Sequence, residues 1–317
     1  MKQLLEKLVS IPSVPGCEDT MREYIKEELI NVFDEVKTDS LGNLICRKKG
    51  SGKARVFMTH MDCDGLVATY CDGANVNVAP LGNIKAQHAA YRRVTFFTGH
   101  HGLLIPPQSY SSETKISDFV VQLGDTPEKE IPLGTKAYFD DSLLCLEGDF
   151  VSSATLSSRV SIACLVSAAK KADFSDRDTY FVFTVQERLG GRGAQASLDG
   201  INAGQIYNFR AVAFGKNGNP AKPGVGNGVA VNVMGKGFLC ETEEVQRFEK
   251  LCDENCIKAV MFTDANIASD ATFAGKAGEG SSIAEICIPV DNMGSAAEVL
   301  KLSDAESVSD LVKVLIK

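Results

Sequence analysis

The chain opens with helix-like and strand-like hydrophobic periodicity in alternation. Residues 1–10 and 18–32 repeat apolar positions at three- and four-residue spacing, so each is predicted to be an amphipathic helix. Next, EVKT and LICRKK flank the turn DSLGN at residues 39–43, a pattern typical of a β-hairpin. The apolar run ARVFMT, which ends at His60, predicts a buried strand. This order indicates the beginning of an α/β domain.

The pattern changes between residues 65 and 150. Short apolar segments such as LVATYC, NVNVAP, RVTFFTG and DFVVQLG are separated there by glycine, proline, asparagine and aspartate. Short strands with frequent turn residues are typical of a small β-barrel or sandwich. We therefore expect residues 65–150 to form an inserted β domain.

Helix and strand patterns alternate again after residue 151. SSRVSIACLVSAAKK, ETEEVQRFEKLCDENC and ESVSDLVKVLIK predict helices, whereas DTYFVFTV, QIYNFRAVAF, GVAVNVM, AVMF and AEICI predict strands. Such alternation is typical of a sheet covered by helices. The sequence thus predicts one discontinuous α/β domain, residues 1–64 and 151–317, interrupted by the β domain.

Composition and charge narrow the possible functions. The formal net charge of −8 argues against a general nucleic-acid-binding protein, because neutralising phosphates requires a basic face. No apolar run is long enough to cross a bilayer, and charges interrupt the N-terminal segment MKQLLEKLVSIPS, unlike a signal peptide. The ten cysteines lack paired metal-type spacing, which favours reduced thiols and a cytoplasmic protein.

Candidate catalytic groups stand at the ends of two predicted strands. His60 and Asp62 are separated by one residue, so their side chains share a face on extended chain. An imidazole with a carboxylate partner is common at zinc, although the H-x-D pattern occurs widely. Glu187 follows DTYFVFTV and precedes the glycine-rich turn GGRG, where a carboxylate can act as a general base. A capping or ion-paired glutamate fits that motif equally well.

Four segments with more specific patterns follow one another along almost the whole chain: TDSLGNLICRKKG, THMDCDGLV, FVFTVQERLGGRGAQ and IPVDNMGSAAEVLKLSD. They resemble the D-x-x-GN hairpin, the AHMDEIGL motif, the FVFTVQEEVGLRGA motif and the closing IPTRYMHSPVEV segment of the glutamyl-aminopeptidase family of dinuclear metallopeptidases. The resemblance implies a metallo-aminopeptidase-like αβα sandwich with an inserted small β-barrel. It also implies that a pair of zinc or cobalt ions activates a water to remove N-terminal residues from peptides. Family members often form twelve-subunit tetrahedral assemblies, which implies a homo-oligomer with dimer contacts through the inserted domain.

Residue by residue, the resemblance preserves little of the metal site. His60 matches a histidine ligand, Asp62 its orienting carboxylate and Glu187 the general base. The other four ligand positions are substituted, by Ser157 for the bridging Asp, Arg188 for the Glu after the base, Phe209 (or Asn208, with a one-residue shift) for another Asp, and Gly294 for the late His.

A shift of register does not recover these ligands. No Asp or Glu occurs between Asp149 and Asp173 or between Asp199 and Glu241, and no histidine follows His101. A zinc site usually needs three or four protein ligands. We therefore predict a site without tightly bound metal.

Arg188 is expected to take over the role of the lost metal charge. A guanidinium beside the remaining carboxylates would repel a metal ion and would pair with Asp62 or Glu187, which are otherwise difficult to ionise close together. The favoured hypothesis is thus a catalytically silent relative that binds a peptide, a small molecule or a partner, or that serves in an assembly.

Two other hypotheses remain open. One is an active metallo-aminopeptidase that recruits ligands such as His100, His101 or Asp270, although the two adjacent histidines also fit a simple turn. The other is metal-free hydrolysis by Cys63, or by Ser157 with Ser158. It is disfavoured because Cys63, next to Asp62, would point to the opposite face of the strand, away from the histidine that a triad requires.

Overall fold

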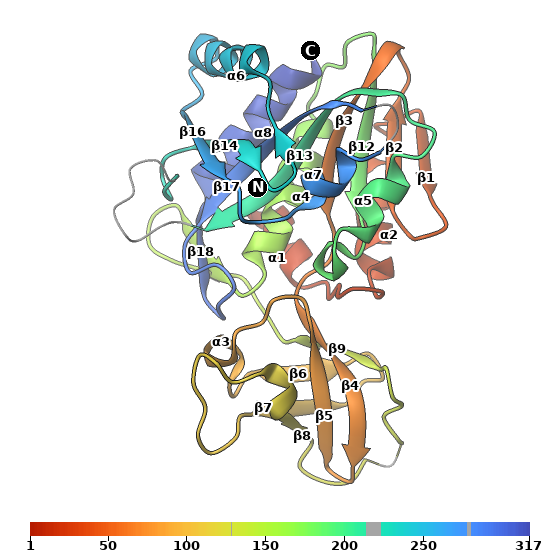
Figure 1. Cartoon of the computed structure of the whole chain (residues 1–317), viewed down its shortest axis with the longest axis vertical. Coiled ribbons are helices and arrows are strands. Elements are labelled where there is room, and N and C mark those ends of the chain that lie inside the picture. Colours follow the sequence, from red (N-terminus) through yellow and green to blue (C-terminus); the bar gives the residue numbers. More distant parts are fainter. Residues whose placement is uncertain (128, 214–222, 278–279) are drawn as a thin grey trace.

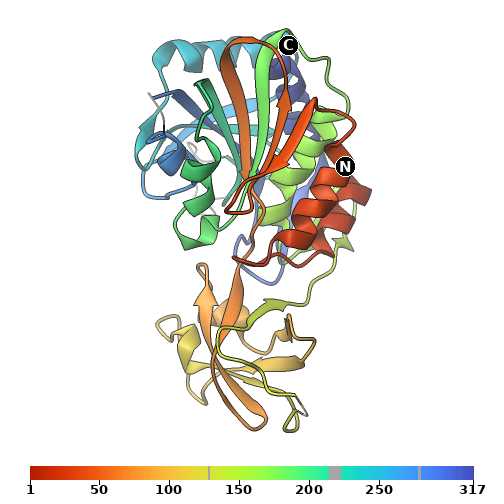
Figure 2. The same ribbon diagram turned by 90° about the vertical axis from the view of Figure 1, so that its right-hand side faces the viewer.

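The computed structural model describes residues 1–127, 129–213, 223–277 and 280–317. Figure 1 shows a larger α/β part above a small barrel, and Figure 2 shows how the chain passes between them. Within these ranges, none of the helices combines the length and the apolar character that crossing a membrane would need.

A mixed sheet forms the centre of the α/β part. The described part of the chain contributes nine strands: β1 (Glu35–Thr38), β2 (Leu44–Lys48), β3 (Ser51–His60), β12 (Arg177–Thr184), β13 (Ala203–Ala213), β14 (Val229–Gly235), β15 (Phe238–Leu239), β16 (Ala259–Asp264) and β17 (Ser282–Val290). Their order is β1-β2-β12-β3-β13-β17-β14-β15, with β16 paired to β14. Strands β12, β3, β13 and β17 are parallel, so their carboxyl ends meet at one edge of the sheet.

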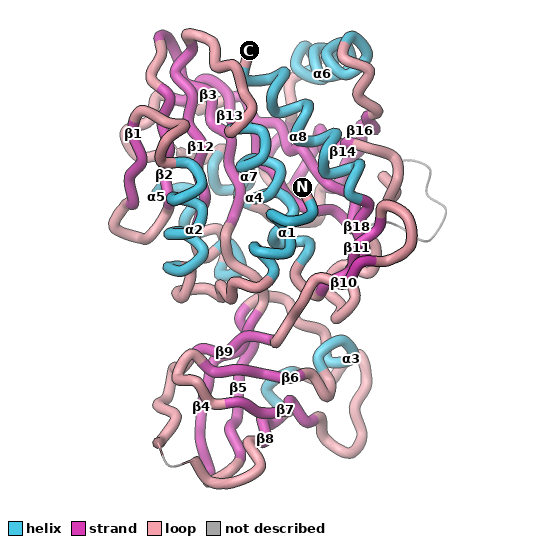
Figure 3. The backbone as a smooth tube through the Cα atoms, turned by 180° about the vertical axis from the view of Figure 1, so that it is seen from behind, coloured by secondary structure: helices cyan, strands magenta, loops and turns pink. Residues whose placement is uncertain are grey.

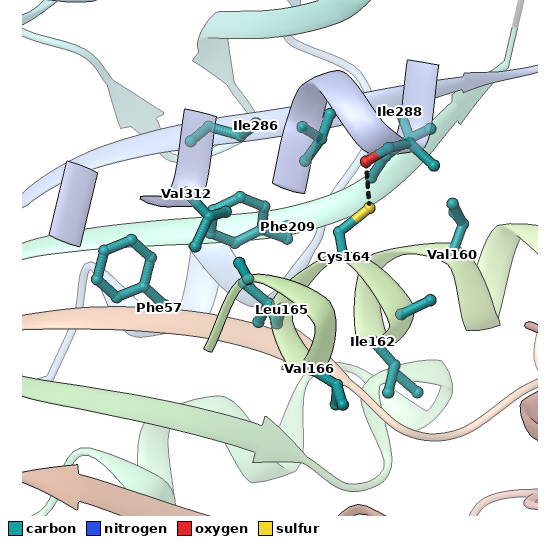
Figure 4. Close-up of a cluster of buried hydrophobic side chains, with 14 of the residues drawn as sticks. Phe57, Val160, Ile162, Cys164, Leu165, Val166, Phe209, Ile286, Ile288 and Val312 are labelled. Carbon is teal, nitrogen blue, oxygen red and sulfur yellow. Dashed lines mark hydrogen bonds between the residues drawn. The ribbon is translucent and has the colours of Figure 1, made fainter. Parts of the chain in front are cut away.

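Helices cover both faces of this sheet. One face carries α1 (Lys2–Val9), α2 (Asp19–Leu29), α4 (Leu156–Ala169), α6 (Thr242–Glu254) and α8 (Leu302–Ile316), and the other carries α5 (Arg192–Ser197) and α7 (Asp270–Ala274). Figure 3 shows α1, α4 and α8 from behind. Every residue of α4 except Ser167 is buried, because this helix lies between α8, α1 and the sheet. Figure 4 shows Phe57 and Phe209 of the sheet near Leu165 of α4.

The barrel has a separate core. It consists of β4 (Gly65–Asp72), β5 (Asn75–Leu81), β6 (Arg93–Phe96), β7 (His101–Ile105), β8 (Val120–Gln122) and β9 (Lys136–Phe139), with α3 (Ala86–Ala89) and the 3-10 turn η1 (Ile116–Asp118). Phe96, Leu104 and Phe119 are fully buried inside it. Closure pairs the strands around a complete ring and so leaves few open edges.

Three short strands lie where the chain returns from the barrel. They are β10 (Leu144–Cys145), β11 (Phe150–Ser153) and β18 (Glu298–Lys301). Pairing of β11 with β18 ties the returning chain to its C-terminal part. The domain boundary at residue 150, where Phe150 itself pairs with Lys301, stays a prediction.

The predicted α/β fold with an inserted barrel is confirmed. The hydrophobic pattern did not predict α5, α7, the 3-10 turn η2 (Glu187–Leu189) or the short strands β10, β11 and β18. Each of these elements is too short to show a periodic hydrophobic pattern, since α5 has six residues and α7 five.

Candidate functional site

A small cavity lies at the carboxyl ends of β3, β12 and β13, on the face of the sheet covered by α5 and α7. Its volume is about 60 Å³. Its polar lining comprises His60, Ser157, Glu187, Arg188, Asn208, Arg210, Ser269 and Asp270. The parallel strands bring these residues together, because Thr184 at the end of β12 pairs with His60 at the end of β3.

His60 and Asp62 are held in fixed orientations. Nδ1 of His60 lies 2.8 Å from the backbone oxygen of Asp62 and 3.6 Å from Oδ1 of its carboxylate. A carbonyl oxygen only accepts, so Nδ1 carries the hydrogen in the neutral ring. Burial lowers the pKa of His60, but the negative charge of Glu187 and the contact with Asp62 outweigh burial and raise the pKa.

The Asp62 carboxylate organises the neighbouring strand end. It accepts the backbone N–H groups of Glu187 at 3.1 Å and of Arg188 at 2.9 Å. Burial alone would raise the pKa of Asp62, but His60 and Arg188 together lower it below its usual value. Asp62 therefore stays ionised and fixes the start of η2, which carries both Glu187 and Arg188.

The glycine-rich turn around η2 is fixed from two sides. The amide of Asn43, from the β1–β2 hairpin, accepts the N–H of Val185 at 2.9 Å and donates to the carbonyl of Gly193 at 3.1 Å. Gly191 has a φ of 65°, and a Cβ there would collide with the ring of Phe273 in α7. The hairpin and α7 together thus position the strand end that forms the cavity wall.

Arg188 points into the site. Its side chain is 19% exposed, its Nη2 donates to Oγ of Ser158 at 3.0 Å, and its Nε lies 3.5 Å from Asp64 and 3.6 Å from Glu187. Burial lowers the pKa of Arg188, but the charges of Asp64, Glu187 and Asp62 outweigh burial and raise it. The guanidinium is therefore a permanent positive charge among these carboxylates.

Of the two carboxylates expected to pair with Arg188, the guanidinium contacts Glu187. The ion pair with Glu187 is present, whereas Asp62 contacts the backbone N–H of Arg188 instead of its guanidinium. The additional carboxylate is Asp64, which the sequence reading did not single out. It belongs to the loop after β3 and follows Asp62 by two residues, so the same spacing argument could have identified it.

Ser157 and Gly294, which stand at two of the predicted substituted ligand positions, are joined through Glu298. The carboxylate of Glu298 accepts three hydrogen bonds. Two come from Ser157, from its backbone N–H at 2.7 Å and its hydroxyl at 2.8 Å, and one comes from the backbone N–H of Gly294 at 2.7 Å. Glu298 is 1% exposed, and burial raises its pKa to about 7. Hydrogen bonds between these residues therefore occupy this side of the site, and the sequence reading missed Glu298.

Of the two residues predicted for the third substituted position, Asn208 faces the cavity and Phe209 does not. Asn208 lines the cavity, whereas the ring of Phe209 is fully buried in the core beneath α4 (Figure 4). Neighbouring residues of a strand face opposite sides of a sheet, which explains why only one of them reaches the site. The one-residue shift is thus favoured by the side-chain directions.

Behind Asn208 lies a buried carboxylate that the sequence reading also missed. Glu285 accepts the amide of Asn208 at 3.0 Å and that of Asn232 at 2.9 Å, and it accepts the hydroxyl of Ser269 in a short hydrogen bond. Nε of Arg210 lies 2.8 Å from its Oε2. The guanidinium of Arg210 is therefore a second positive charge at the cavity wall.

Asp270, at the start of α7, lines the same cavity as His60. Its side chain is 2% exposed and accepts a short hydrogen bond from the hydroxyl of Thr184. Burial, reinforced by the charge of Glu187, raises the pKa of Asp270 to about 7. By contrast, His100 and His101 belong to the barrel, where they contact Thr98 and Thr95.

The residues present do not fit a pair of metal ions. In the described ranges, no group of three or more histidine, cysteine, aspartate or glutamate side chains is arranged to hold a metal. Asp270 is an acid close to His60, but two guanidinium groups line the same cavity. Positive charge in the place of ligands disfavours binding of a cation.

The raised pKa of Asp270 gives a prediction for Asp270→Asn. Between about pH 4 and pH 7 the folded protein keeps a proton that the unfolded chain has lost, so this group makes the native state less stable as pH rises. Relative to the variant, the wild type should become progressively less stable as the pH rises through that window. Urea unfolding at several pH values measures the difference. If the free energy of unfolding depended on pH in the same way for both proteins, the prediction would be wrong.

Comparisons with known proteins agree with this architecture. The model of the M42 glutamyl aminopeptidase family matches residues 42–311. A putative aminopeptidase of Acetivibrio thermocellus is 29% identical, over 100% of this chain and 98% of its own length. The lysyl aminopeptidase of Pyrococcus furiosus is 26% identical, over 99% of this chain and 96% of its own length.

Solved structures show the same fold. An aminopeptidase from the archaeon Desulfurococcus kamchatkensis superposes with a TM-score of 0.92 at 23% identity, covering 99% of this chain and 93% of that one. The TET1 peptidase of Pyrococcus horikoshii superposes with a TM-score of 0.87 at 23% identity, covering 99% of this chain and 98% of that one. Since the family model spans most of the sequence, this chain belongs to the M42 glutamyl aminopeptidase family.

Proposed function

We propose that this chain is a family member in which an arginine–carboxylate network replaces the metal pair, and that it binds a ligand without hydrolysing peptides. The observation that carries the proposal is the position of Arg188. Its guanidinium lies within 3.6 Å of both Asp64 and Glu187 and shares the cavity with His60. A positive charge at this place compensates the carboxylates that a metal ion would otherwise neutralise.

The network also leaves Glu187 without the partner that a general base needs. A base in a hydrolase must reach the proton of an activated water. The carboxylate of Glu187 is instead paired with Arg188, at a position where the residues present do not fit a metal ion. In this proposal Glu187 and Asp62 have structural and ligand-binding roles.

The test is metal content measured together with hydrolysis. After dialysis against zinc or cobalt and removal of free ions, the protein should retain well below one ion per chain. It should hydrolyse the p-nitroanilides of lysine, glutamate and leucine no faster than a blank. The lysyl aminopeptidase of Pyrococcus furiosus, treated identically, serves as the positive control. Two retained ions per chain with metal-dependent hydrolysis would overturn the proposal.

A homo-oligomer is the second part of the proposal. The TET1 peptidase of Pyrococcus horikoshii is described as assembling into a tetrahedron or an octahedral shell. The barrel of this chain exposes large apolar side chains, namely Tyr70, Tyr91, Phe97, Leu103 and Leu133. Apolar side chains that gather into a patch on a protein surface are typical of surfaces that bind another protein. We therefore propose that barrels of neighbouring copies contact each other.

Light scattering after size-exclusion chromatography tests this arrangement. The wild type should elute with a mass that is a multiple of the 34.0 kDa chain. The double change Tyr70→Asp and Leu133→Asp, at side chains 64% and 79% exposed, should reduce that mass. Leu239→Asp, at a side chain 71% exposed in the α/β part, is the matched control and should leave the mass unchanged. A monomeric wild type would exclude the proposed contact.

A further inference from the structure

The cavity wall contains buried polar atoms that have no partner within the described ranges. They are Nη2 of Arg210, Oδ1 of Asn208 and Oδ1 of Asp270. These residues are 7%, 2% and 2% exposed, and all three line the cavity. Buried polar groups in native proteins almost always have a hydrogen-bond partner. Three residues that line one cavity and each carry such an atom therefore indicate that a polar occupant belongs there.

The orphan atoms and their neighbours carry charges of both signs. Arg210 and Arg188 offer guanidinium groups, while Glu187 and Asp270 offer carboxyl groups. A simple anion in this space would meet the two acids, and a simple cation would meet the two guanidinium groups. A molecule that carries both a carboxylate and an ammonium group satisfies both sets of groups. The charge pattern thus favours a zwitterion.

The size of the cavity sets a second limit on the occupant. One water needs about 10–15 Å³ of such space. The volume of about 60 Å³ therefore suits a group of roughly five non-hydrogen atoms. The head of an α-amino acid, with its nitrogen, Cα and carboxylate, is a zwitterion of this size. Ile267, which is 45% exposed, and Met293 also line the cavity and supply apolar contacts for a side chain.

We propose that this cavity binds a free α-amino acid with an apolar side chain. The carboxylate accepts from Nη2 of Arg210, and the ammonium group donates to Glu187 and to Oδ1 of Asp270. Arg210 keeps its contact with Glu285, which holds the guanidinium in place. The inference rests on the proposed function, because metal ions in the same space would exclude this ligand.

A free amino acid fits better than the end of a longer peptide. A peptide N-terminus supplies the ammonium group, but its first carbonyl belongs to a neutral amide and offers Nη2 of Arg210 no charged acceptor. A peptide C-terminus supplies the carboxylate, but it has no ammonium group for Glu187 and Asp270. Only the free amino acid presents both charges on one carbon atom.

The experiment is calorimetric titration of dialysed, metal-assayed protein with L-leucine. Two analogues test the two halves of the head group: 4-methylpentanoate lacks the ammonium group, and 3-methylbutylamine lacks the carboxylate. Each charge-assisted contact should contribute enough that either analogue binds at least about tenfold more weakly than leucine. Equal binding of leucine and either analogue would overturn the zwitterion assignment, as would equal binding of inorganic phosphate.

Variants locate the site. Glu187→Gln and Arg210→Gln should each weaken leucine binding by about tenfold or more, whereas Arg93→Gln, at an exposed arginine of β6, should have no effect. Arg210→Gln also removes a partner of Glu285, so circular dichroism checks its fold. If that variant does not fold, Glu187→Gln and the analogue series decide the question. Unchanged affinity in Glu187→Gln would overturn the placement.

Failure of this inference is distinguishable from failure of the proposed function. Folded wild-type protein that holds no metal, hydrolyses no p-nitroanilide and does not bind leucine would overturn the amino-acid site alone. Protein that retains two ions per chain and hydrolyses the substrates would overturn the proposed function, and the amino-acid site with it. Tighter binding of leucylglycine than of leucine would point to a peptide N-terminus and would also overturn the inference.

Discussion

Replacing Arg188 with methionine is expected to lower the free energy of unfolding by about 2–3 kcal/mol at neutral pH. Methionine preserves most of the apolar volume but removes the positive charge that faces Asp64, Glu187 and Asp62. These carboxylates then face one another across a partly buried space without compensation. Urea unfolding followed by circular dichroism measures the loss.

The loss should shrink as pH falls. Without the guanidinium, the neighbouring carboxylates repel one another, and protonation on acidification relieves this repulsion in the folded variant. The difference in stability between the variant and the wild type should therefore become smaller as the pH is lowered.

Arg192→Met is the matched control for this experiment. Arg192 lies four residues after Arg188 on the same turn and is exposed. Its guanidinium donates to the amide oxygen of Gln186. Its replacement should change stability by less than about 0.5 kcal/mol. Equal losses in both variants, or a loss in Arg188→Met that does not depend on pH, would show that Arg188 does not compensate these carboxylates.

Replacing Glu285 with glutamine is expected to destabilise the protein by about 3–5 kcal/mol. The carboxylate is 1% exposed, and its partners in the described part of the chain are all donors: the amides of Asn208 and Asn232, the hydroxyl of Ser269 and the guanidinium of Arg210. A glutamine would turn an NH₂ group toward donors and leave a buried guanidinium without its counter-charge. Thermal and urea unfolding measure the change.

A second substitution separates the effect of the unpaired Arg210 charge from the effect of the lost hydrogen bonds of Glu285. In Glu285→Gln combined with Arg210→Met, the guanidinium that lost its partner is absent, so the double variant should be more stable than Glu285→Gln by at least about 1 kcal/mol. Glu254→Gln, at an exposed position of α6, should have almost no effect. A double variant that is less stable than both single variants would contradict the proposed role of the ion pair.

The sequence by itself predicted the architecture because the hydrophobic patterns of the long elements are clear. The strand ending at His60, the strand before Glu187 and the helix that contains Ser157 lie where their periodicity places them. It also identified the strand end that carries Glu187 and Arg188, since the order of motifs is specific. The absence of acidic residues from two long segments, and of histidine after His101, is a fact of composition and did not depend on structure.

Only the tertiary structure decided which charged groups meet. Arg210 and Glu285 lie on the neighbouring strands β13 and β17, 75 residues apart in sequence, and Glu298 reaches Ser157 from a distance of 141 residues. Asp270 enters the cavity on a helix too short to be predicted. Periodicity specifies which face of an element is apolar, but the partner of a buried charge depends on which strands lie side by side. The sequence therefore predicts which ligand positions are substituted, whereas the packing of the chain decides which residues lie together around the cavity.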